Sequence, residues 1–124
     1  MHVLPAAMAP VFELPGVEFT AMAAPSRGSK ELCTWKLAVA AHLPPAQPHS
    51  LERDEIFMIT AGAIRLQPGG TIARAGDAVV VPAGSSIQLA NPGSEPAEVY
   101  VAVRAGFTAS AADGTPIDTP PWAI

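Results

Sequence analysis

The chain has 124 residues, of which 49% are hydrophobic and 15% charged, and this length suits one domain with a single core. The composition excludes a disordered chain, and the surplus of apolar residues indicates an oligomer interface or an apolar pocket. Seven basic and eleven acidic side chains give a net charge of −4. Because no basic patch is present, we expect no binding to nucleic acid or to an anionic membrane.

Cys33 is the only cysteine, so no internal disulfide can form, and we interpret it as a small buried hydrophobic residue. No stretch reaches the roughly 18 apolar residues of a membrane helix, and the N-terminus lacks a basic region followed by a long apolar run. These features predict a cytoplasmic protein.

The first third of the chain predicts three strands behind an N-terminal arm. Short strands are expected over 11–14 and 17–22, because Pro15-Gly16 is suited to a turn. A longer strand over 31–41 alternates apolar and polar residues, and its apolar face consists of Cys33, Trp35, Leu37 and Val39. These side chains are therefore expected in the core.

Proline and glycine divide the rest of the chain into short extended segments. Prolines follow the third strand, so His49 begins a new segment. Further strands are predicted over 55–61, 63–66, 71–74, 78–81, 86–90 and 97–104. No helical period is present, and this pattern predicts an all-β antiparallel sandwich, jelly roll or closed barrel.

The predicted domain comprises residues 1–124, with an arm over 1–16, a core over about 30–105 and a tail over 106–124. The tail ends in Pro120-Pro121-Trp122. We expect Trp122 to dock against the body of the protein by packing.

Two segments resemble the motifs of the cupin superfamily. The second cupin motif, Gly-x(5)-Pro-x-Gly-x(2)-His-x(3)-Asn, is matched in register by Gly76, Pro82, Gly84 and Asn91, with Ile87 at the histidine position. Each of these glycines also suits a corner where a positive φ is expected.

The first motif, Gly-x(5)-His-x-His-x(3,4)-Glu-x(6)-Gly, is matched by His49, Glu55 and Gly62. Leu51 then takes the second histidine position, and Leu43 the opening glycine. In the other register, Gln47 and His49 form the pair, with five residues before Glu55. The resemblance implies a cupin double-stranded β-helix, or jelly-roll barrel, that pairs as a homodimer.

The resemblance also implies an incomplete metal site. Metal-binding cupins typically hold the ion with three histidines and one glutamate, and here His49 and Glu55 alone stand at ligand positions. Two protein ligands are a poor cage for a divalent ion, so we expect no cofactor. The alternative is a weakly bound divalent metal. Its added ligand would be Gln47, or Gln88 if a bulge turns that side chain inward.

The predicted site is an apolar pocket for a small molecule, with Glu55 as general acid/base and His49 as its partner. Strand parity turns Leu51, Phe57, Ile59, Ile87 and Leu89 toward it, and the candidates for further lining are Gln47, Trp35, Leu37, Tyr100 and Arg104. Enclosure by apolar side chains would raise the pKa of the Glu55 carboxyl. Structural roles for the pair are an ion pair of Glu55 with Arg53 or Arg65, and a rim hydrogen bond of His49.

Three function classes follow. The first is an enzyme that performs metal-independent isomerisation, dehydration or cyclisation of a hydrophobic metabolite. The second is a metal-dependent cupin dioxygenase or isomerase with unusual ligands. The third is a non-catalytic binding or sensor domain.

Overall fold

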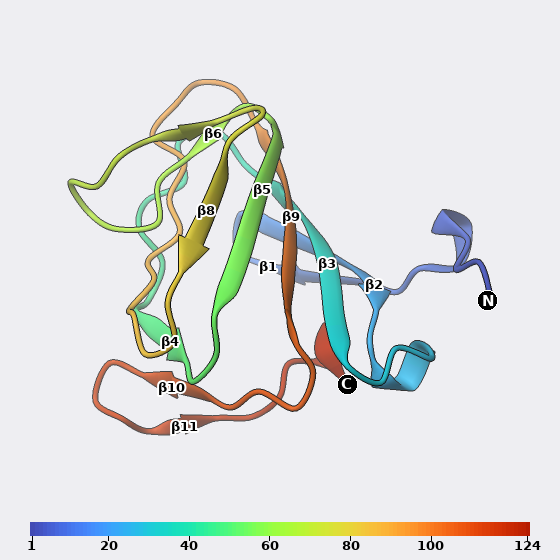
Figure 1. Ribbon diagram of the computed structural model, residues 1–124. Coiled ribbons are helices and arrows are strands. Elements are labelled where there is room, and N and C mark those ends of the chain that lie inside the picture. Colours follow the sequence, from blue (N-terminus) through green and yellow to red (C-terminus); the bar gives the residue numbers. More distant parts are fainter.

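The computed structural model describes residues 1–124 and is dominated by one six-stranded antiparallel sheet (Figure 1). From edge to edge, its strands are β1 (Val11–Leu14), β2 (Val17–Ala23), β3 (Leu32–Val39), β9 (Ala97–Arg104), β5 (Glu55–Ala61) and β8 (Ala78–Val81). The two longest strands, β3 and β9, pair along their full lengths at the centre of the sheet. The first and last thirds of the chain therefore meet in the middle of the sheet.

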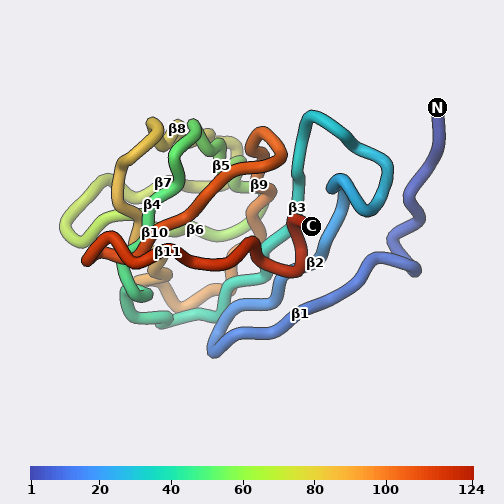
Figure 2. The backbone as a smooth tube through the Cα atoms, turned by 90° about the horizontal axis from the view of Figure 1, so that it is seen from below, coloured from blue at the N-terminus to red at the C-terminus, as the bar shows by residue number.

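A smaller sheet packs against one face of the large one. It contains β11 (Pro116–Ile117), β10 (Ala109–Ala111) and β4 (His49–Leu51) in that order. A bridge to Ile87 extends it, because the Ile87 N–H donates to the His49 carbonyl and the His49 N–H donates to the Ile87 carbonyl, at 2.7 and 3.1 Å. The tail thus completes this sheet beside β4 (Figure 2).

The remaining elements are short. The hairpin strands β6 (Ala63–Ile64) and β7 (Ala73–Arg74) pair with each other, and three 3₁₀ turns are present: η1 (Ala6–Met8), η2 (Pro25–Arg27) and η3 (Pro121–Ala123). None of the helical segments has the length and apolar character that a membrane span needs.

Alternation along the strands decides which side chains enter the core. In β3, the four apolar side chains predicted to share a face are all buried, because successive residues of a strand point to opposite faces. In β9, the buried face consists of Ala97, Val99, Val101 and Val103. Register then places Cys33 and Glu55 on either side of Val103, and Trp35 and Phe57 on either side of Val101. Glu55 therefore lies in a row of the sheet that is otherwise apolar.

The turn after β5 depends on Gly62. Its φ is +68°, and a Cβ at this position would lie against the Pro96 carbonyl oxygen and 2.9 Å from the Ala97 Cα. Only glycine meets both conditions without strain. Gly62 is also the closing glycine of the first motif, so this part of the resemblance has a steric basis.

Most strands lie where the sequence predicts them, with two differences. Residues 86–90 form bridges and no regular strand, because Ile87 bonds to β4 while Ala90 pairs with Arg65 after β6. This segment changes partner within three residues, which prevents a continuous ladder. The tail, by contrast, contains β10 and β11, which were not predicted.

Candidate functional site

A cavity of about 350 Å³ lies between the two sheets. The large sheet supplies Leu14, Phe19, Trp35, Leu37, Glu55 and Phe57. The side of β4 and its bridge supplies Gln47, Pro48, His49, Leu51, Ile87 and Leu89. The tail supplies Phe107, Ala109, Ala111, Ile117, Pro120 and Trp122. The lining is largely apolar with a few polar groups, which is typical of a small-molecule site.

Glu55 is the buried carboxyl of this cavity. It is the first residue of β5 and is 4% exposed, with Val103 and Val81 as its cross-strand partners. Its Oε2 has no hydrogen-bond partner. Burial raises the pKa of the Glu55 carboxyl to about 7, because the charged form loses hydration without compensation. Near neutral pH, both protonation states of this side chain are therefore populated.

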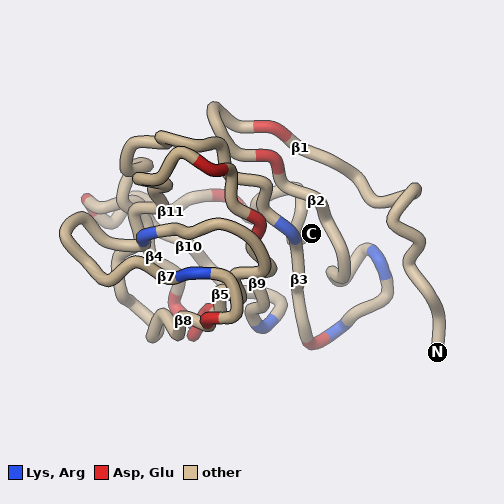
Figure 3. Tube along the Cα trace, turned by 90° about the horizontal axis from the view of Figure 1, so that it is seen from above, with Lys and Arg blue, Asp and Glu red and all other residues tan.

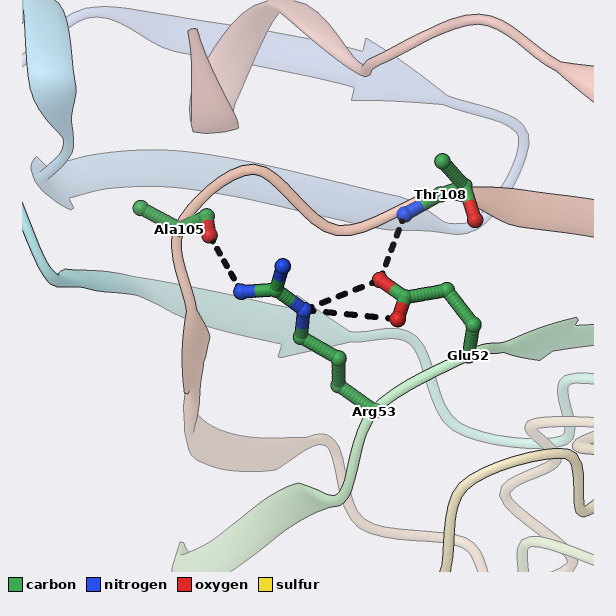
Figure 4. Close-up of polar contacts among 4 residues, drawn as sticks. All are labelled: Glu52, Arg53, Ala105 and Thr108. Atoms are coloured by element: carbon green, nitrogen blue, oxygen red, sulfur yellow. Dashed lines mark hydrogen bonds and ion pairs between the residues drawn. The ribbon is translucent and has the colours of Figure 1, made fainter.

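The two arginines that the sequence offers as partners of Glu55 lie elsewhere. Arg53 Nε is 3.0 Å from Glu52 Oε1, and Arg53 Nη1 donates to the Ala105 carbonyl at 2.6 Å (Figure 4). Arg65 forms no ion pair, and its buried Nε has no hydrogen-bond partner. The structural alternative for Glu55, an ion pair with Arg53 or Arg65, is therefore not formed.

Glu52 and Arg53 instead hold the start of the tail. Glu52 Oε1 accepts the N–H of Thr108 at 2.9 Å, while Arg53 bonds to Ala105 (Figure 4). The bend that leads from β9 into the tail is thus tied to the loop just before Glu55. The acidic run has a structural role here, and it leaves the Glu55 carboxyl free of charged neighbours.

His49 reaches the same cavity from β4. Its backbone is held on both sides, by Ala111 of β10 and by the bridge to Ile87. The ring Nδ1 lies 3.5 Å from the Gln47 carbonyl oxygen, which is at the long limit of a hydrogen bond. The imidazole therefore lies on the cavity wall with one weak contact to the protein.

The structure brings most of the predicted site residues together. The cavity is lined by Glu55, His49, Gln47, Leu51, Phe57, Ile87, Leu89, Trp35 and Leu37. Ile59 is buried in the core but lies outside the lining.

The expected inward positions of Tyr100 and Arg104 are wrong. The opposite face of β9, with its three valines, is the buried one, while Tyr100 is half-buried and Arg104 exposed. Glu98 shares their face and pairs with Lys36. Turning this face inward would bury charges without partners. The polar composition of the face therefore indicated, in the sequence alone, that it points outward.

Two parts of the lining were not predicted. Phe19 lies on a strand whose inward face is only weakly marked, since β2 contains few large apolar residues. Phe107 and Trp122 belong to the tail. Trp122 was expected to dock, and it does so against Phe19, with ring centroids 3.8 Å apart; its place in the cavity wall could not be read from the pattern.

A family model described as "Cupin domain" matches residues 34–103. This match spans more than half of the chain and includes β4, β5 and the Ile87 bridge, which supply one part of the cavity wall. The chain therefore belongs to the cupin family, and its fold is the all-β cupin barrel.

Solved structures resemble the chain over most of its length. The match with an RmlC-like cupin protein from Ralstonia eutropha JMP134 spans 98% of this chain and 79% of that protein, at 15% identity and a TM-score of 0.74. The match with the polyketide cyclase RemF from Streptomyces resistomycificus spans 84% of this chain and 79% of that enzyme, at 12% identity and a TM-score of 0.71. The match with a sugar phosphate isomerase of the cupin superfamily from Silicibacter pomeroyi spans 80% of this chain and 67% of that protein, at 23% identity and a TM-score of 0.66. No curated protein matches the sequence. These likenesses establish the fold.

The residues present do not fit the metal site of three histidines and one glutamate. The positions of the second and third histidines hold Leu51 and Ile87, both buried on the cavity wall. No group of three or more His, Cys, Asp or Glu side chains is placed to hold an ion. Gln88 is engaged elsewhere, since its Nε2 donates to the Ala46 carbonyl at 3.2 Å. Divalent zinc normally takes three or four protein ligands, so this donor set falls short.

Proposed function

We propose that this cupin is an enzyme that moves protons on an apolar small molecule, with Glu55 as general acid/base and His49 as its partner. The observation that carries this proposal is the Glu55 carboxyl, which is buried against an apolar cavity with Oε2 unpaired. A buried carboxyl without a structural partner is destabilising. Its presence on a cavity wall is what a catalytic role would explain.

The proposed chemistry uses both protonation states of Glu55. The carboxylate removes a proton from an acidic C–H or O–H of the bound molecule, and the resulting carboxylic acid returns a proton to a second atom. A pKa of about 7 suits this cycle, because a general acid/base is most effective when its pKa lies near the working pH. Isomerisation, dehydration and cyclisation all fit this scheme.

His49 has a supporting place in the scheme. The small sheet places it on the wall of the cavity that Glu55 also lines. Its weakly engaged ring can hydrogen-bond a carbonyl or hydroxyl of the ligand and so orient the reacting atoms. The cyclase and the isomerase among the similar structures perform reactions of the proposed classes on the same fold.

The test is proton exchange on a model ketone. We expect the protein to accelerate deuterium incorporation at the α-carbon of 2-tetralone in D2O, followed by NMR. Glu55→Gln should lower that rate roughly 100-fold or more, while the exposed Glu18→Gln should keep it. Activity that survives in Glu55→Gln would exclude the assigned role. Ligand-induced stabilisation without any exchange would favour a binding or sensor domain.

We also propose that the protein forms a homodimer through the β1 edge. β1 has only one strand neighbour, so its other edge is unpaired, and the arm before it lies beside β2 and η2, close to this edge. Met8 and Val11 are 75% and 51% exposed there, and an exposed apolar edge invites pairing. Light scattering during gel filtration should give twice the chain mass, and Val11→Asp should give the monomer. A monomeric wild-type protein at micromolar concentration would exclude this dimer.

A further inference from the structure

The aromatic side chains of this protein are gathered around one cavity. The chain has four phenylalanines, two tryptophans and one tyrosine. Phe19, Trp35, Phe57, Phe107 and Trp122 all line the cavity between the sheets. Phe12 adjoins it, with its ring centroid 6.2 Å from that of Trp122. Tyr100 alone lies on the outer face of the large sheet, so the aromatic content is concentrated at one place.

These rings surround a shared space and are tilted against one another. Trp35 is the centre of the group, with the Phe107 and Trp122 centroids 6.3 and 6.5 Å away and tilted by 42° and 58°. Phe57 lies in the same cross-strand row as Trp35, with the smaller Val101 between them. Tilted rings at these distances offer both edge-to-face and offset-stacked contacts to a further ring. A flat aromatic ligand would therefore meet favourable partners on more than one side.

The cavity has no cationic counterpart for an anionic ligand. None of the seven Lys and Arg residues lines it, and their positions are scattered along the trace (Figure 3). Glu55 and His49 are the titratable side chains on its wall. A carboxylate or phosphate would lose its hydration there without a strong partner and would face the Glu55 carboxyl. The lining therefore selects against anions.

We infer that the ligand of this cavity is an uncharged, flat aromatic molecule with a single polar group directed toward Glu55. The inference rests on the proposed function only in naming Glu55 as the group that acts on this ligand. A volume of about 350 Å³ is at the low end for small-molecule sites. The ligand is accordingly a small fused-ring compound such as a naphthol or a benzo-fused ketone.

The test compares three probes that share one skeleton, by calorimetric titration at pH 7. The probes are 2-naphthol, its saturated analogue 2-decalol, and the anion 2-naphthoate. We expect 2-naphthol to bind about tenfold or more tightly than either of the others, since two good aromatic contacts are worth about that factor. Equal or tighter binding of 2-decalol or 2-naphthoate would overturn the inference, and so would failure of all three to bind.

Variants locate the preference in the cavity. Phe107→Leu and Trp122→Leu keep an apolar wall but remove a ring, and each should reduce the preference for 2-naphthol over 2-decalol by about threefold or more. Tyr100→Leu removes the aromatic residue outside the cavity and should leave it unchanged. An unaltered preference in both cavity variants, with folding verified by circular dichroism, would overturn the assignment of these rings.

The two proposals fail separately. Glu55→Gln should retain the naphthol preference while it loses exchange on 2-tetralone. If the variant keeps its exchange activity, the proposed function is wrong and the aromatic preference stands. If the wild-type protein catalyses exchange but prefers 2-decalol, the inference about ligand class is wrong and the acid/base role stands.

Discussion

Trp122 stacks on Phe19, with 15° between the ring planes, and this contact joins the end of the tail to β2. Trp122→Ala should therefore lower the free energy of unfolding by about 2 kcal/mol, less than for a fully buried tryptophan because the side chain is half-buried. Urea denaturation measures the loss. Phe12→Leu, which removes a tilted contact with the same ring, is the control and should cost less. Equal losses would show that the stack is not what holds the tail.

Glu55→Gln should stabilise the protein at neutral pH. The folded-state pKa of about 7 lies above the ordinary pKa of 4.5 for a glutamate carboxyl in the unfolded chain, so the folded state binds the proton more tightly. Stability is then highest below pH 4.5 and falls as pH rises toward 7. That loss amounts to about 3 kcal/mol, and the variant avoids it.

The measurement is the difference in unfolding free energy between variant and wild type from pH 4.5 to 8. This difference should grow with pH and level off above about 7. Exposed Glu18→Gln is the matched control and should stay within about 0.5 kcal/mol of wild type throughout. A flat difference for Glu55→Gln would mean that the carboxyl is solvated in the folded protein.

Restoring the two missing histidines should create a metal site. Leu51 and Ile87 occupy those positions of the cupin motifs and line the cavity with His49 and Glu55. The double variant Leu51→His/Ile87→His should bind one Ni²⁺ per chain roughly 100-fold more tightly than wild type, because it supplies four donors in place of two.

Calorimetry and elemental analysis test this prediction together. Adding Glu55→Gln to the double variant should weaken the site again. Wild-type protein purified without added ions should carry far less than one metal per chain. A stoichiometric ion that chelators remove together with activity would instead support the metal-dependent alternative.

Gly62→Ala should be far more costly than Gly76→Ala. Both glycines have positive φ, at +68° and +94°, but only Gly62 would place its Cβ against backbone atoms of Pro96 and Ala97. We expect a loss of about 1–2 kcal/mol for Gly76→Ala from backbone conformation alone, and about 3 kcal/mol or more for Gly62→Ala. Thermal unfolding of the two variants gives the comparison, and similar losses would contradict the steric argument.

Local patterns explain why much of the fold could be predicted. The alternation in β3 and the apolar run in β5 are encoded within each strand, as are the turn glycines. Burial of the Glu55 carboxyl followed from its parity with Phe57. The cupin motifs then supplied the topology that local patterns lack. The predicted domain limits and cytoplasmic location stay predictions.

What could not be predicted depends on long-range pairing. Apart from Ile117, β10 and β11 contain alanine, serine and proline, which have little strand preference. They form because their backbones bond to β4 and to each other. A third of the cavity wall therefore comes from a segment whose own composition favours a loop. The prediction that Tyr100 and Arg104 point inward was wrong, because β9 buries its opposite face. Glu98, which shares the face of Tyr100 and Arg104, is a charge that indicated the outer side.

The contact between Cys33 and the tail makes thiol labelling a probe of how the tail moves. Cys33 is 0% exposed, its Sγ donates to the Ala123 carbonyl at 3.5 Å, and burial raises the pKa of its thiol. Since it is the only thiol in the chain, a disulfide reagent can react at one place alone, and only when a local opening, such as displacement of η3 from β3, exposes the Sγ. A ligand held behind Trp122 should therefore slow this labelling, because Trp122 belongs both to η3 and to the cavity wall.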